Sequence, residues 1–195
     1  WYLYLIMDIY SRKIVAWEVH EAESGDLARR LVERALLREG CWLDPPVLHS
    51  DNGAPMTSYT LKARLADLGM LMSHSRPRVS NDNPYSESLF RTVKYCPEWP
   101  SKGFQSLTAV RDWMLAFEDA YNEQHLHSGI RFVTPADRHR GTDYERLAHR
   151  KMVYERAKRR NPRRWSGPTR NWEVTGPVSL NPGKLQEIER NKLAA

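Results

Sequence analysis

A strand-like start that gives way to helical spacing restricts the fold of this chain more than any other feature. Residues 1–8 are apolar and aromatic, as in a buried strand, and residues 13–20 alternate as a second strand would. Ser11-Arg12 predicts a short turn between the two. The chain should therefore open with a hairpin whose apolar face has to be covered by helices.

Helices and strands then alternate along the chain. Helices are predicted to begin at Ser24 or Asp26 and end at Gly40, to span about 58–68, to begin at Asn83-Pro84, and to span about 106–123 and 143–160, with short strands at 47–50 and 70–75. The last 35 residues hold several Pro and Gly and indicate a small irregular or β extension. This order predicts an α/β fold with a mixed sheet.

Positive charge is concentrated in one stretch of the chain. The net charge is +6, yet residues 138–172 contain twelve Lys or Arg and three acids, which gives 12 − 3 = +9 and leaves about −3 for the rest. A near-neutral body with a basic segment is typical of proteins that bind polyanions such as DNA. A solvated basic helix explains a charge run equally well, so both interpretations stay open at this point.

Cysteine content and hydropathy exclude several protein classes. Cys41 and Cys96 are far apart, which argues against a disulfide framework and favours a reducing, cytoplasmic compartment. No apolar run approaches the roughly 18–20 residues of a membrane span, and the first residues lack the features of a signal peptide. A strand-like start without a lead-in also predicts that a natural N-terminal part precedes this sequence.

Asp51 is the first acid with a suggestive context. It ends the short strand 47–50 and precedes Asn52-Gly53, so its carboxylate is expected in the crevice at the strand's C-terminal end, where ligands bind in open α/β sheets. Asn-Gly is also the strongest short hairpin signal. Taken alone, these residues favour a plain hairpin turn.

Glu87 is the second candidate, in the first turns of the helix that begins at Asn83-Pro84. Arg91 and Lys94 lie four and seven positions on, so all three share one helix face. A surface ion pair is the ordinary explanation. A carboxylate on a rigid helix could instead hold a metal ion while Lys94 binds DNA.

Two further patterns receive ordinary explanations. Trp113, Phe117 and Tyr121 recur at i, i+4 and i+8, which favours a core stripe over a stacking platform. No His/Cys spacing matches a structural zinc site, so none is predicted.

Three blocks of sequence together resemble a known family. They are YLIMDIYSRKIVAWEV at 4–19, HSDNG at 49–53 with DNPYSESLFRTVK at 82–94, in which 35 residues separate Asp51 from Glu87, and YNEQHLHSGIRFVTPADRH at 121–139. The chain is similar to the integrase core of bacterial insertion-sequence transposases, of the type encoded by the second reading frame of two-frame elements. These are DDE-superfamily relatives of retroviral integrases. The resemblance covers about residues 1–140.

The resemblance implies a fold and a site. The fold is an RNase H-like mixed sheet flanked by helices over residues 1–140, followed by a basic helical segment and small extension over 141–195. In that family three carboxylates hold two divalent ions, Mg²⁺ or Mn²⁺, and Asp51 matches the second acid and Glu87 the third. Such ions activate the attacking oxygen and neutralise the departing one in DNA cutting and joining.

The same resemblance implies partners and a location. The partner is DNA, both element ends and target, and the protein is expected to be a homo-oligomer on DNA in the bacterial cytoplasm, associated with the nucleoid and not with a membrane. The predicted DNA-binding residues are Arg91, Lys94, Arg159, Arg160, Arg163 and Arg164.

One departure from the family concerns the first acid. It belongs to a strand with the pattern W-x-x-D-[IC]-T, which does not occur in this sequence, so the first strand and its metal ligand are predicted to be missing. Asp8 corresponds to a different family position and is predicted to bond turn amides around Ser11-Arg12. The chain is then expected to be inactive as it stands.

Two alternatives remain. The first is a non-catalytic, DNA-binding remnant of a decayed transposable element. The second is an RNase H-type nuclease acting on hybrids, which the HSDNG and YN…HSG blocks disfavour.

Overall fold

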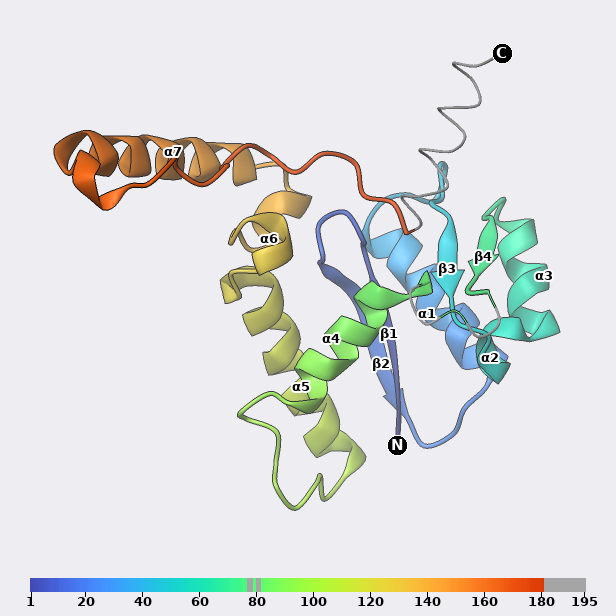
Figure 1. The fold of residues 1–195 in the computed structure, drawn as a ribbon. Coiled ribbons are helices and arrows are strands. Elements are labelled where there is room, and N and C mark those ends of the chain that lie inside the picture. Colours follow the sequence, from blue (N-terminus) through green and yellow to red (C-terminus); the bar gives the residue numbers. More distant parts are fainter. Residues whose placement is uncertain (77–78, 80–81, 181–195) are drawn as a thin grey trace, which may run out of the picture. The chain divides into compact units, whose positions relative to one another are not determined.

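The computed structural model describes residues 1–76, 79 and 82–180, which form a mixed α/β chain of helices and small sheets (Figure 1). The strands are β1 (Tyr2–Met7), β2 (Ile14–His20), β3 (Leu48–Ser50) and β4 (Met72–His74). The helices are α1 (Gly25–Arg38), α2 (Ala54–Thr57), α3 (Tyr59–Asp67), α4 (Pro84–Lys94), α5 (Leu107–Asp119), α6 (Pro135–His139) and α7 (Asp143–Arg160), with short turns η2 (Ala120–Gln124), η3 (Ser128–Ile130) and η4 (Pro162–Arg164).

The strands form two separate pairs in the described part of the chain. β1 pairs with β2, and β3 pairs with β4 in parallel, with Leu48 opposite Met72 and Ser50 opposite His74. The predicted strands are therefore present, but the single mixed sheet expected for them is divided. Within the described residues each of the four strands, β1 and β3 included, has a strand partner on one side only.

Helix α1 forms where local signals agree. Ser24 is its N-cap and accepts a hydrogen bond from the amide of Leu27 at 3.2 Å, which selects Ser24 over Asp26 as the cap. Gly40 has φ of +68°, the left-handed conformation that ends a helix most cheaply in glycine. The helix therefore begins and ends where the sequence predicts.

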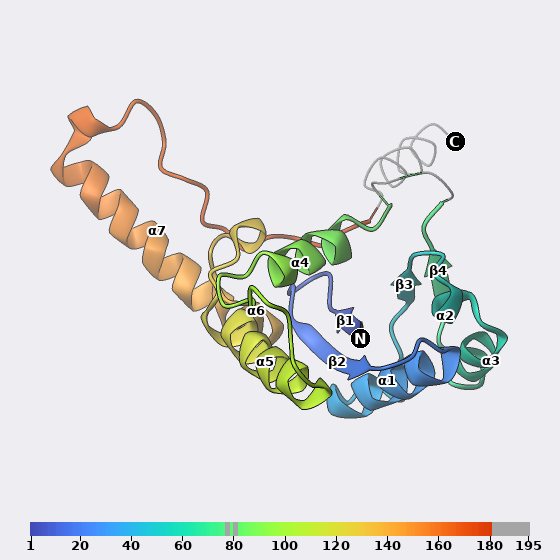
Figure 2. The same cartoon turned by 90° about the horizontal axis from the view of Figure 1, so that it is seen from below.

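One apolar side of α1 serves both strand pairs. Val32 and Leu36 are buried with Leu48 of β3 and the apolar side of α3, and Leu31 and Ala35 are buried against β2. Side chains of β1 pack against both clusters. In Figure 2, α1 runs beside α3 and below the strands. The core of this region is thus one layer of helix against strands.

The chain divides into two compact units. The first contains Trp1–Met7 and Val15–Asp112 with the described residues 178–180, and the second contains Asp8–Ile14 and Trp113–Pro177. The predicted boundary between residues 140 and 141 stays a prediction. Residues 161–180 contain η4 and otherwise irregular chain, in line with the expected extension, whose last part, 181–195, lies outside the described residues.

In the second unit, α5 continues into η2, a wider π-helical turn that local spacing does not predict. Phe117 and Tyr121 are buried, and stacked rings join Trp113 to Phe117 at 5.2 Å and Phe117 to Tyr121 at 5.8 Å. The predicted core stripe is confirmed for Phe117 and Tyr121, and Trp113 is half-buried beside them. Asn122 in η2 accepts from the Ile14 amide at 2.9 Å and donates to its carbonyl oxygen at 3.0 Å. This amide pairs with the backbone as a neighbouring strand would.

Helix α7 spans the predicted 143–160. Its first turn carries Asp143 and Glu145, and its last turn carries Lys158, Arg159 and Arg160. The side-chain charges at both ends therefore interact favourably with the helix dipole. Among the helices of the described residues, none combines the length and the apolar character that crossing a membrane requires.

Candidate functional site: an acid pair on a strand end and a helix

Asp51 follows β3 directly, at the carboxyl end of the parallel pair β3–β4, and is exposed. Its Oδ1 accepts a hydrogen bond from the Gly53 amide at 3.0 Å, and Gly53 is the N-cap position of α2. The alternative of a plain hairpin at Asn52-Gly53 is wrong, because these residues turn the chain from a strand into a helix. Asp51 therefore has the position that the functional interpretation requires.

The turn at Asp51 is fastened to the end of β4. Asn52 Nδ2 donates to the carbonyl oxygen of Ser75 at 2.8 Å, and the Ser75 amide donates to that of Ser50 at 3.0 Å. Ser50 Oγ donates to the Asp51 carbonyl oxygen at 3.0 Å, and His74 Nδ1 lies 3.1 Å from Ser50 Oγ and 3.2 Å from the Asp51 carbonyl oxygen. These bonds hold the Asp51 backbone and leave its exposed carboxylate accessible.

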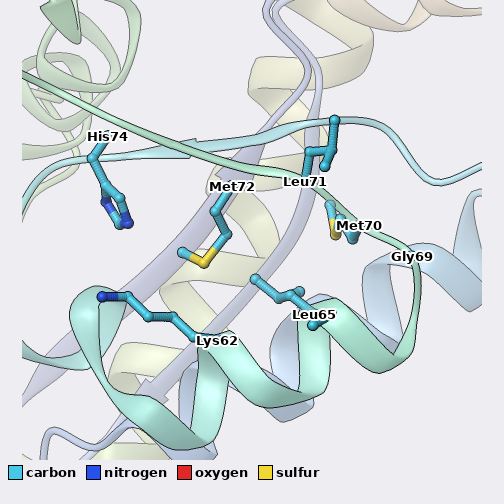
Figure 3. A pocket seen from close by; sticks show the side chains of 8 residues that line it. Lys62, Leu65, Gly69, Met70, Leu71, Met72 and His74 are labelled. Atoms are coloured by element: carbon cyan, nitrogen blue, oxygen red, sulfur yellow. The ribbon is translucent and has the colours of Figure 1, made fainter.

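A shallow pocket of about 460 Å³ lies between α3 and β4 (Figure 3). Lys62 and His74 stand at one end, and the rest of the lining is mostly apolar, including Leu65, Met70 and Met72. The lining contains no carboxylate, so this pocket does not extend the acid site.

Glu87 lies in the first turn of α4 and is exposed together with Arg91 and Lys94. Leu89 and Val93 are buried on the opposite side of the same helix. The predicted shared face of one carboxylate and two cations is therefore present. Rigid helical backbone fixes the order of these charges along the face.

Asp82 precedes this helix and was not singled out by the sequence. It is 1% exposed, and its Oδ2 accepts from the Arg76 amide at 2.8 Å and from Arg76 Nε at 2.9 Å, while Oδ1 accepts from Nη2 at 2.9 Å. The pair joins the chain just after β4 to the start of α4, and so helps to position Glu87. The sequence signal that could have identified Asp82 is its position directly before the helix start at Asn83-Pro84.

The two acids have the donor chemistry of a divalent-cation site. Asp51 and Glu87 belong to the same compact unit and are exposed, and carboxylate oxygens are the ligands that Mg²⁺ prefers. Over residues 1–76, 79 and 82–180, no group of three His, Cys, Asp or Glu side chains forms a metal site. The residues thus fit part of such a site, and their convergence on one ion stays a prediction.

Asp8 has the structural role predicted for it. Its carboxylate accepts hydrogen bonds from the amides of Tyr10 and Ser11, both at 3.1 Å, and from Ser11 Oγ at 2.6 Å. His139 Nδ1 lies 3.3 Å from Oδ2. Burial raises the pKa of Asp8, but these hydrogen bonds outweigh burial and place the pKa below its ordinary value. Tyr10 and Ser11 lie in the β1–β2 turn, in which Arg12 has φ of 69°, so the Asp8 carboxylate bonds to this turn and to His139 of α6 beside it.

The twelve cations of residues 138–172 fall into two sets of six. One set is engaged by protein groups: Arg138 with Asp143, Arg140 with Glu123, Arg146 with Asp137, Lys151 with Glu173, Arg150 with the Arg131 carbonyl oxygen and Trp172, and Arg170 with the rings of Phe132 and Trp172. The other set has no ion pair with any described residue: Arg156, Lys158, Arg159, Arg160, Arg163 and Arg164. The sequence could not separate the sets, because the pairing depends on tertiary contacts.

Comparison with known proteins places these observations in a family. Two family models, both described as an integrase core domain, match residues 1–80 and 68–135. Over 140 residues the chain is 29% identical to the transposase for insertion sequence element IS904 of Lactococcus lactis, covering 70% of this chain and 53% of the relative.

More distant relatives point the same way. The chain is 26% identical over 140 residues to a Mycobacterium tuberculosis protein named as a transposase for IS986/IS6110, with 70% and 50% of the two chains covered. It is 23% identical over 143 residues to InsK of Escherichia coli, named as a transposase for IS150, with 70% and 47% covered. The chain thus covers about half the length of these relatives. By these matches, residues 1–135 have an integrase core domain similar to that of insertion-sequence transposases.

Proposed function

We propose that this chain is the core of a transposase that cuts and joins DNA at the ends of an insertion element, with Asp51 and Glu87 as the second and third acids of its site. The position of Asp51 carries the proposal. It lies exposed at the carboxyl end of a parallel strand pair, on a turn held by four neighbouring residues, where open α/β sheets bind ligands.

Asp51 and Glu87 would hold divalent ions, Mg²⁺ or Mn²⁺, two in the complete site. When bound, such ions activate the attacking oxygen and stabilise the departing one. The protein's own contribution is positional. Asp51 is fixed through its backbone to β4, and Glu87 through the Arg76–Asp82 pair at the start of α4.

The RNase H-like sheet is part of the proposal. α1 packs against both strand pairs, yet β1 and β3 each have a free side in the described chain. Unpaired backbone groups at such edges favour pairing with another strand. A strand from sequence outside these 195 residues, bearing the first acid, would pair there and join the two pairs into one mixed sheet.

DNA contacts are assigned to two exposed sets of cations. Arg91 and Lys94 share the face of Glu87 and would bind phosphates next to the reacting one. Arg159, Arg160, Arg163 and Arg164 would bind DNA outside the site, because phosphate contacts supply affinity without reading sequence. The working form would be a homo-oligomer that holds element ends and target together in the bacterial nucleoid.

One observation favours a second function, that of a non-catalytic DNA-binding remnant. No third acid joins Asp51 and Glu87 in a metal-binding group within residues 1–76, 79 and 82–180, while five exposed cations (Arg156, Arg159, Arg160, Arg163 and Arg164) stay available to DNA. In this alternative the chain binds DNA but never supports strand joining, whatever sequence precedes it.

The test uses the chain extended at its N-terminus by the upstream coding sequence. Strand joining of element-end DNA is measured with Mg²⁺ or Mn²⁺ for the extended protein, for Asp51→Asn and Glu87→Gln, and for Asp67→Asn as an exposed acid outside the site. Joining that is lost in the first two variants and kept in the third supports the transposase. An extended protein that contains the acidic strand and still joins nothing overturns it in favour of the remnant.

A further inference from the structure

The basic segment has a built shape that its charge alone does not explain. After α7 and η4 the chain runs back along the helix (Figure 1, orange to red). Thr169 bonds to the carboxylate of Glu155, Lys151 Nζ lies 3.7 Å from Glu173, and Arg131 donates to the Asn171 carbonyl oxygen. We call α7, η4 and this returning chain, residues 143–175, the arm.

Arg138 closes the base of the arm. Its side chain is fully buried, and it donates to the carbonyl oxygens of Tyr10 at 2.9 Å and Thr175 at 2.6 Å and to Asp143 at 3.2 Å. One guanidinium therefore binds the start of α7 and the end of the returning chain together. A planar donor fork suits such a junction, because it serves several acceptors in fixed directions.

Trp172 fixes the middle of the arm. It is 5% exposed and forms a cluster with Ile130, Val133 and Leu147, and its ring lies 5.0 Å from that of Tyr154. A buried tryptophan of this kind contributes a large apolar area to the attachment. The returning chain is thereby held on α7 as part of the folded unit.

Beyond these anchors, the far end of the arm is rich in positively charged side chains. Residues 156–164 contain six cations, all without an ion pair to any described residue, and no acid. We call these nine residues the tip. Lys158, Arg159 and Arg160 also oppose the helix dipole, but this effect is confined to the last turn and does not account for Arg163 or Arg164 in η4.

We infer that the arm holds duplex DNA, and that within the basic segment the engaged cations stabilise the arm while only the tip contacts phosphates. The inference rests on the proposed function for its choice of DNA as partner. An anionic membrane is a poorer fit, because the only apolar side chains of the tip are Ala157 and Pro162, and surface helices need an apolar face to enter lipid.

Replacing cations of the tip and replacing engaged cations should affect the salt dependence of DNA binding differently. Each phosphate contact contributes about −0.9 to the slope of log affinity against log salt, so six tip contacts give a slope near −5. Replacing four tip cations should remove about 3.6 from that slope. Replacing four engaged cations should leave the slope nearly unchanged and lower the thermal stability of the arm.

The experiment compares matched variants of the 195-residue chain on a duplex of random sequence. The tip variant carries Arg159→Gln, Arg160→Gln, Arg163→Gln and Arg164→Gln, and the base variant carries Arg146→Gln, Arg150→Gln, Lys151→Gln and Arg170→Gln. A Lys62→Gln, Lys102→Gln variant removes two exposed charges from the other unit. It shows how much the slope changes through net charge alone, and it still gives this comparison if the base variant unfolds. Salt-dependent affinity and melting temperature are measured for each.

A slope that flattens only in the tip variant, with an unchanged melting temperature, supports the inference. Equal flattening per charge in the tip and Lys62/Lys102 variants overturns it, because binding then follows net charge. Binding of wild type to anionic vesicles as tight as to duplex also overturns it. Strand joining plays no part in these measurements, so a failure of the proposed transposase activity would show separately.

Discussion

The guanidinium of Arg138 lies 4.0 Å from the centre of the Tyr10 ring and donates a 2.9 Å hydrogen bond to the carbonyl oxygen of the same residue. The contact joins the β1–β2 turn to α6. Because Arg138 also pairs with buried Asp143, its charge is compensated inside the second unit.

Replacing this group should be costly. Arg138→Met leaves Asp143 buried without its cation, and breaking a buried pair in this way costs about 3–5 kcal/mol. Urea unfolding followed by near-ultraviolet circular dichroism measures the loss. Arg140→Gln is the control, because Arg140 and Glu123 are exposed and such pairs contribute at most about 1 kcal/mol. Similar losses for both variants would contradict the assigned role of Arg138.

Asp8 should stabilise the fold in a pH-dependent way. Its pKa in the folded chain lies below the ordinary 3.8, so the carboxylate contributes stability above about pH 4 that is lost as the pH falls through the folded pKa. Asp8→Asn should therefore melt at a lower temperature than wild type at pH 7, and the gap should close in acid. Melting curves from pH 7 to pH 3 test this. A gap independent of pH would mean that the carboxylate charge is not what the turn uses.

His127 should destabilise the fold in acid. Burial lowers its pKa to about 4, with help from the charges of His125 and Arg12, while the ordinary value is 6.5. The unfolded chain therefore takes up a proton at a higher pH than the folded chain, and stability is lost as the pH falls from about 6.5 to about 4. His127→Gln should weaken the pH dependence of melting in that window. The same change at exposed His149 should have no such effect, and equal effects would refute the assignment.

Local signals predicted the elements of this fold better than its assembly. α7 agrees with the prediction at both ends, because acidic and basic residues mark its termini. The π-helical turn at Asn122 was missed, since its side chain bonds to Ile14, which is remote in sequence. Division of the sheet into two pairs was missed as well, because strand pairing is decided by tertiary partners that propensity does not encode.

The candidate site divides in the same way. The position of Asp51 after a strand and of Glu87 on a helix face followed from the order of residues and from the family resemblance. The bonds that hold the Asp51 turn, such as Asn52 to Ser75, did not, and neither did the Arg76–Asp82 pair. These contacts join residues from different segments, so the residue pattern within one segment does not predict them.

The last prediction concerns the activity of the chain itself. We expect the 195 residues to bind DNA but to show neither cleavage nor joining of element ends with Mg²⁺ or Mn²⁺. Within the described residues no third acid completes a metal-binding group with Asp51 and Glu87, and β1 and β3 each lack a strand partner on one side, which also predicts a tendency to aggregate.

Extension of the chain by an upstream strand that carries an acid should restore metal-dependent joining. Asp8 is the discriminating residue, because it directly follows β1 in the opening block and could be mistaken for the missing ligand. Its carboxylate is already occupied by Tyr10, Ser11 and His139, so Asp8→Asn in the extended protein should lower melting temperature and leave the joining rate nearly unchanged. Gel assays of joining, run below the melting temperature of both proteins, separate the two effects. If the unextended chain joins DNA and Asp8→Asn abolishes that activity, Asp8 is the first acid and the assignment of the opening strand is wrong.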